Sequence, residues 1–140
     1  MATITITLYV SESGIAQNAI TQQNINDYCY FEAGTANSDF NTTADVGDTI
    51  IWQGQTNPAS NYVIDITQVK KDNVPGNQNV LGGNNGTLQG NGLSPETVTG
   101  TVQANTYSEA EEYSVFFKVN GTGTNFQVDP KITVNPRQTA

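Results

Sequence analysis

The chain has no histidine, a single cysteine (Cys29) and a single tryptophan among its 140 residues. Without imidazole it can form neither a Ser–His or Cys–His nucleophile nor a histidine-ligated zinc or copper site. One cysteine cannot close an intrachain disulfide, and the aromatic neighbours of Cys29 predict a small buried side chain, with a reactive thiol as the alternative. We therefore expect no cofactor, no bound metal and no enzymatic activity.

Positive charge is also scarce, with five basic residues against 13 acidic ones and a net charge of −8. Nucleic-acid binding needs a basic face that neutralises phosphates, and anionic membranes attract the same kind of face. No apolar run approaches the length of a membrane span, and the alternating N-terminus lacks the regions of a signal peptide. We expect a cytoplasmic protein that binds neither nucleic acid nor membranes, although export by a route without a cleavable signal stays open.

What the sequence does have is alternation of period two. Ile4, Ile6, Leu8 and Val10 alternate with threonine and tyrosine, which indicates a strand with one buried face. Similar short segments recur at 28–31, 49–52, 62–69, 98–102, 113–119, 126–128 and 132–134. Seven to nine short strands without an amphipathic helix predict an all-β protein, an antiparallel β-sandwich of immunoglobulin- or cupredoxin-like topology.

The stretch from about 70 to 96 is dense in glycine and asparagine and reads as a long loop region. Val80, Leu81 and Leu88 are expected to pin part of it to the core. Neither half of the chain has enough apolar strands for its own core, so we expect one domain over 1–140. Pro130 has no N–H, so it is expected to end one strand and precede another.

Acidic residues occur near two strand starts. Asp45 and Asp48 flank a glycine turn, and we expect the Asp48 side chain to fix that turn. Glu109, Glu111 and Glu112 are expected to form a solvated entry to the next strand. A carboxylate-dependent hydrolase would need two such groups facing each other across a cleft, which sequence proximity does not indicate. The glycine-rich stretch 82–92 contains no acid and is not a calcium loop.

Aromatic residues give the candidate interaction surface. Parity directs Tyr113 and Phe117 to the core and Phe116 outwards. Trp52 is either a packing residue or a platform for stacking a sugar ring. A patch of Phe116 with Trp52 or Tyr62 would be the natural surface for another protomer or a ligand.

The stretch 46–52 (VGDTIIW) also resembles a cupredoxin strand, but copper would need two histidines. Together with 44–45 and with 126–134 (FQVDPKITV), it resembles the AidA/PixA inclusion-body protein family. The opening strand at 4–10 and the aromatic strand at 113–119 follow in the same order along nearly the whole chain. The resemblance implies a small bacterial β-protein found in cytoplasmic inclusions or under quorum or virulence control, with no established catalytic residues. The namesake inclusion protein of the family is rich in methionine, whereas this chain has one methionine. A sulfur-storage role is therefore not expected.

Three functions remain in order of preference. The first is a non-enzymatic, self-associating inclusion-body-type or accessory structural protein, since strand edges rich in threonine, asparagine and glutamine lack charged residues that prevent pairing. The second is a carbohydrate-binding module or lectin, with Trp52 or Tyr107 as the platform. The third is the carboxylate-dependent hydrolase. The expected partners are therefore further copies of the chain or a glycan.

Overall fold

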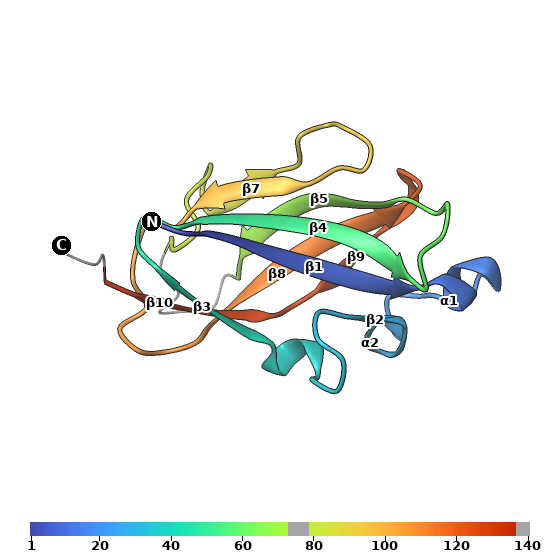
Figure 1. Cartoon of the computed structure of the whole chain (residues 1–140), viewed down its shortest axis with the longest axis horizontal. Coiled ribbons are helices and arrows are strands. Elements are labelled where there is room, and N and C mark those ends of the chain that lie inside the picture. The colour runs from blue at the N-terminus through green and yellow to red at the C-terminus, as the bar shows by residue number, and fades with distance from the viewer. Residues whose placement is uncertain (73–78, 137–140) are drawn as a thin grey trace.

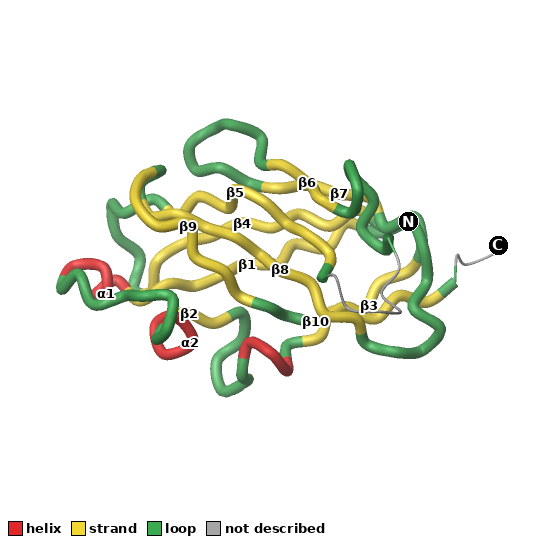
Figure 2. Tube along the Cα trace, turned by 180° about the vertical axis from the view of Figure 1, so that it is seen from behind, coloured by secondary structure: helices red, strands yellow, loops and turns green. Residues whose placement is uncertain are grey.

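A computed structural model describes residues 1–72 and 79–136 and contains two β-sheets, one in front of the other (Figure 1). The first sheet has the strand order β2-β1-β4-β7 and consists of Cys29–Tyr30 (β2), Thr3–Ser11 (β1), Thr49–Asn57 (β4) and Val98–Thr101 (β7). The second has the order β3-β10-β8-β5-β6 and consists of Asn41–Asp45 (β3), Lys131–Asn135 (β10), Glu111–Val119 (β8), Ile64–Lys71 (β5) and Thr87–Gln89 (β6). In it, Thr122–Val128 (β9) also pairs with β8 (Figure 2).

The all-β class is confirmed, but the strand pairing is mixed and not wholly antiparallel. Strand β1 runs parallel to β4 from Thr3↔Thr49 to Ser11↔Asn57, and β10 runs parallel to β3. Parallel neighbours need a crossover connection. The chain supplies one here, because it passes through β3 of the second sheet between β1 and β4. Alternation of residue types predicts where strands lie, whereas it carries no information on their relative direction.

The inward side chains of both sheets form one core. At its centre the Trp52 indole N–H donates to the Tyr113 hydroxyl at 3.1 Å, and the two rings meet edge to face at 5.9 Å. This bond links β4 of the first sheet to β8 of the second and satisfies both polar groups in the interior.

The predicted register of β8 is confirmed. Tyr113 and Phe117 are buried, and Phe116 is half-buried on the other side of the strand. Ser114 shares the outward parity of Phe116 but is buried, and its hydroxyl lies 2.7 Å from carboxylate oxygens of both Asp72 and Asp129.

The prediction for Pro130 is also confirmed. It lies between β9 and β10, which follow one another along the same side of β8. Its carbonyl oxygen accepts a hydrogen bond from the Tyr113 N–H at 3.0 Å. Pro130 therefore bonds to β8 through its carbonyl, although it has no N–H to donate.

In its described part, the region expected to be a long loop contains the strand β6, which pairs with the end of β5. Val80 and Leu81 are buried and Leu88 packs against the core, as predicted. Pro75 and Gly76 lie outside the described residues. The described residues also form three short helical segments: Glu12–Ala16 (α1), Ile25–Tyr28 (α2) and the 3-10 turn Asn37–Asp39 (η1).

Candidate interaction surface

Trp52 does not belong to a surface, and that part of the predicted patch is wrong. Its side chain is 1% exposed, because it shares the inward parity of Ile50 along β4. Tyr62 and Phe116 are half-buried, on the approach to β5 and on β8 respectively. A buried indole cannot stack on a sugar, so the three side chains do not form the expected platform.

The first sheet has a feature that residue-by-residue reading missed: none of its four strands carries a charged side chain. Within residues 1–72 and 79–136, the charged strand residues all lie in the second sheet, and they are Asp45, Asp65, Lys70, Lys71, Glu111, Glu112, Lys118 and Lys131. The signal was present in the sequence, but it becomes visible only when the pairing is known, since the four strands are far apart along the chain.

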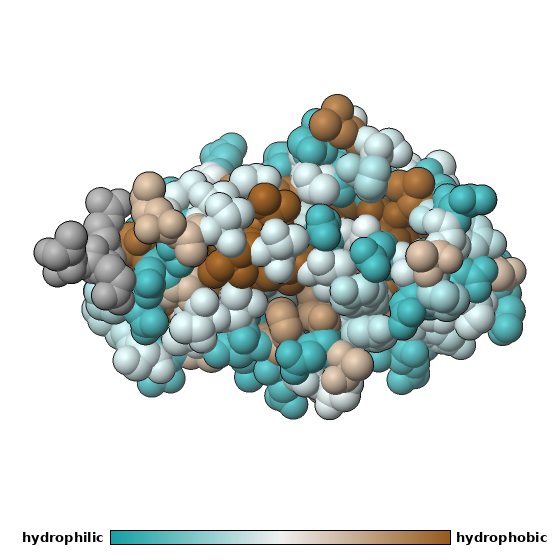
Figure 3. All heavy atoms as spheres, viewed as in Figure 1, coloured by the Kyte–Doolittle hydropathy of each residue, from teal (hydrophilic) through white to brown (hydrophobic). Residues whose placement is uncertain are grey.

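The outward face of the first sheet is an array of hydroxyl and amide side chains. The cross-strand register places Thr3 beside Thr49, and Thr49 beside Thr101. The next row contains Thr5, Ile51 and Thr99. Further along, the Gln53 side-chain N–H donates to the Thr7 hydroxyl at 3.1 Å, and Tyr9 stacks on Tyr30 of β2 with centroids 5.3 Å apart. Figure 3 looks onto this face, where pale and brown atoms lie between scattered teal ones.

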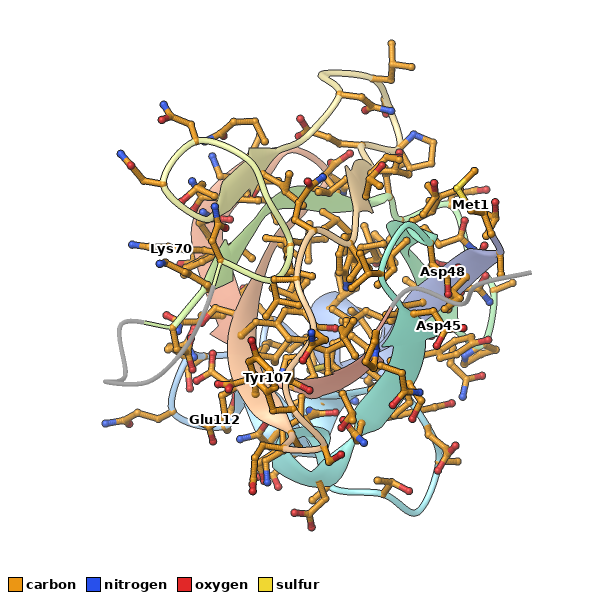
Figure 4. All side chains as sticks on the ribbon, turned by 90° about the vertical axis from the view of Figure 1, so that its left-hand side faces the viewer. Met1, Asp45, Asp48, Lys70, Tyr107 and Glu112 are labelled. Carbon is orange, nitrogen blue, oxygen red and sulfur yellow. The ribbon has the colours of Figure 1, made fainter. Side chains whose placement is uncertain are left out.

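Asp48 aligns the start of the first sheet. Its carboxylate accepts the N–H of Asp45 at 2.9 Å and the N–H of Ala2 at 2.8 Å. These bonds hold the pKa of Asp48 below its ordinary value, since they favour the charged form. Figure 4 shows Asp45 and Asp48 close to Met1. The predicted structural role of Asp48 in the turn is confirmed.

The second acidic group lies elsewhere. Figure 4 shows Glu112 on the opposite side of the molecule from Asp45 and Asp48. Partial burial, and then repulsion from Glu109, raise the pKa of Glu111 above its ordinary value. The two acidic groups therefore do not face each other across a cleft, as a carboxylate-dependent hydrolase requires. Among residues 1–72 and 79–136, no three Cys, Asp or Glu side chains are grouped as metal ligands.

A hollow of about 640 Å³ lies next to Cys29, between α2 and the segment that leads to η1. Cys29 is 4% exposed and its thiol donates to the Ile25 carbonyl at 3.2 Å. Burial raises the pKa of the Cys29 thiol to about 12, so the reactive thiolate is absent at neutral pH. The structural interpretation of Cys29 is thus confirmed.

Asn37 lines the same hollow. Its amide N–H groups donate to Asn26 Oδ1 at 3.0 Å and to the Cys29 carbonyl at 3.1 Å, which fixes the orientation of the amide. Its Oδ1 is buried and has no hydrogen-bond donor within the described part of the chain. Most of the other lining side chains are hydroxyls and amides, and Asp27 is the one charged side chain in the lining.

The fold defines the class of protein: an all-β chain of two mixed sheets around one core. No protein-family model matches the sequence. No curated protein matches it either. Among solved structures, the chain is similar to the inclusion body protein PixA from Burkholderia cenocepacia J2315, with a TM-score of 0.59 and 10% identity over 96% of this chain and 97% of that one. The resemblance seen in the sequence is supported at the level of the fold.

Across the described segments, the structure contains no helix long and apolar enough to cross a membrane.

Proposed function

We propose that this chain is a non-enzymatic protein that self-associates, of the inclusion-body or accessory structural type, and that it belongs to the AidA/PixA family. The observation that carries the proposal is the uncharged first sheet in a chain of net charge −8. Copies of an acidic protein repel one another. A face without charge is where two copies approach with the least repulsion and the least desolvation of ionised groups.

Two further observations support the proposal. The chain has the fold of a protein described as an inclusion body protein. Its residues also offer little to catalysis, because there is no histidine, the Cys29 thiol is buried and protonated, and Asp48 is engaged in backbone hydrogen bonds.

Sedimentation velocity over a concentration series tests self-association. A lysine placed on the uncharged sheet by Thr5→Lys should leave the protein monomeric where the unaltered chain associates. The matched control is Thr124→Lys, which makes the same change at an exposed position of β9 in the second sheet. Both variants lower the net negative charge equally, so a difference between them reports the surface and not overall repulsion. A chain that stays monomeric at every concentration contradicts the proposal.

A second candidate function rests on the hollow beside Cys29. Hydroxyl and amide groups such as those of Ser11, Asn26 and Asn57 are the groups that bind a neutral polyhydroxylated ligand, and Tyr30 offers an aromatic ring there. In the carbohydrate-binding alternative, the candidate glycan site is therefore this hollow and not Trp52. A glycan array tests it: binding that Asn57→Ala abolishes supports a glycan site at the hollow, and an array without any binding rejects it.

A further inference from the structure

Strand β1 is paired on one side only for most of its length. It pairs with β4 over all of Thr3–Ser11, but on its other side β2 pairs only with Tyr9 and Val10. Along the rest of that side, Thr3 to Leu8, none of the strands in residues 1–72 and 79–136 pairs with it. The N-terminal two-thirds of β1 is therefore an edge of the first sheet.

The hydrogen bonding shows which residues face this edge. The Thr49 N–H donates to the Ala2 carbonyl at 2.9 Å, which directs the even-numbered residues of β1 towards β4. In a parallel ladder, the N–H and C=O of one residue point to the same side and those of the next residue point to the other. Thr3, Thr5 and Thr7 therefore present their backbone donors and acceptors at the open edge.

The composition of the edge favours pairing with another strand. Over Thr3–Ser11 there is no charge, no proline and no glycine, and threonine alternates with isoleucine and leucine. Natural edge strands usually prevent pairing by lysine, proline, a bulge or a covering segment. Strand β1 contains no lysine, no proline and no bulge, and its residues Thr3 and Thr5 are exposed.

Other edges of the molecule are protected. The Gln22 side-chain amide forms two bonds with the backbone of Gln127 in β9, each 2.9 Å long, so it occupies the edge as another strand would. The pairing of β9 with β8 also shifts register beyond Phe117. At the far side of the first sheet β7 lies against β6 (Figure 2), and β3 is short and ends at Asp45.

We propose that the open edge of β1 binds the β1 edge of a second copy, antiparallel and about a two-fold axis, so that two four-stranded sheets become one. This inference rests on the proposed function, self-association, and identifies the β1 edge as the contact surface. A second copy is the partner that fits, because it brings an equally uncharged edge, whereas the chain as a whole carries a net charge of −8. A two-fold interface requires such self-complementarity.

A two-fold axis at Thr5, the middle of the three edge-facing residues, gives a register that pairs all three. With Thr5 opposite its own symmetry mate, Thr3 of each copy lies opposite Thr7 of the other. All three are residues whose backbone groups face the edge, so each pair exchanges N–H···O bonds. Their threonine side chains share one face of the joined sheet, where threonine pairs across strands are favourable. The pairing between copies ends before Tyr9, because β2 occupies the edge of β1 from that residue on.

Thr5→Pro tests the edge. Proline at this position removes an N–H that faces the edge and leaves the ladder between β1 and β4 intact, and edge strands tolerate it. We expect the dissociation constant of the dimer to rise at least about tenfold, from the bonds lost at the symmetric Thr5 pair, while the circular dichroism melt stays two-state. Ile51→Lys, on the outer face of β4, is the control for association through the face and should associate as the unaltered chain does.

Hydrogen exchange of the unaltered chain gives an answer that does not depend on any variant folding. The amides of Thr3, Thr5 and Thr7 should exchange more slowly as concentration rises. Association without this protection overturns the edge pairing and leaves the proposed function standing. The same holds if Ile51→Lys abolishes association while Thr5→Pro leaves association unchanged. A chain that never associates overturns both.

Discussion

At the scale of single residues, neighbours in the sequence have opposite roles. Phe116 and Phe117 are adjacent in β8, yet Phe117 is fully buried and contacts Phe126 with ring centroids 5.4 Å apart. Phe116 is half-buried on the outward side. Period-two alternation in a strand with one buried face produces this difference.

The adjacent phenylalanines give a matched pair of substitutions. Phe117→Ser removes a large buried side chain and leaves a hydroxyl in the core, so it should lower the free energy of unfolding by about 4 kcal/mol or abolish folding. Phe116→Ser should lower it by about 1 kcal/mol or less. Urea denaturation followed by tryptophan fluorescence measures both. Equal losses for the two variants would contradict the assigned register.

The Cys29 thiol makes stability depend on pH at the alkaline side. Its pKa is about 12 in the folded protein, against an ordinary value of 9.0. Above pH 9 the unfolded chain loses this proton while the folded chain keeps it, so stability falls as pH rises through that window.

Cys29→Ala should therefore flatten the fall in the free energy of unfolding between pH 9 and pH 10, although it removes a buried side chain. Urea denaturation at a series of pH values measures the slope. Burial also raises the pKa of Tyr113, so the fall at higher pH should persist in this variant. An unchanged slope between pH 9 and 10 would show that the thiol ionises freely.

At the scale of elements, the sequence predicts more about strands than about their partners. The alternation at 4–10 and 113–119 identifies β1 and β8 and the buried side of each. It says nothing of the parallel pairing of β1 with β4, because direction follows from where the intervening chain crosses between sheets. The edge of β1 and the uncharged sheet follow from this pairing, so neither could be predicted. Of the two roles open to Trp52, the parity that it shares with Ile50 along β4 selects packing in the core and excludes a surface patch.

Gln22 shows how a single side chain can act on a whole strand. It lies in the loop between α1 and α2 and its amide bonds the backbone of Gln127, 105 residues further along the chain. Gln22→Ala should lower the free energy of unfolding by about 1–2 kcal/mol and speed hydrogen exchange at the Gln127 amide. Gln23→Ala, at the exposed neighbouring position, is the control and should change neither.

At the scale of the whole molecule, charge is divided between the two sheets. In the part of the chain that the structure describes, the second sheet carries every charged strand residue, while the first carries none. In an acidic chain, repulsion between copies should be weakest on the uncharged side, which is where we propose that they approach. Salt should screen the repulsion between the charged sides and leave the proposed backbone pairing at the β1 edge largely unaffected.

Sedimentation velocity at low and high salt tests the account most directly. The unaltered chain should associate as concentration rises, and more strongly at high salt, whereas Thr5→Lys should remain monomeric in both. Association that weakens with salt would point to ion pairs between copies and contradict the uncharged sheet as the contact. A monomer at all concentrations and in both salts would contradict self-association itself.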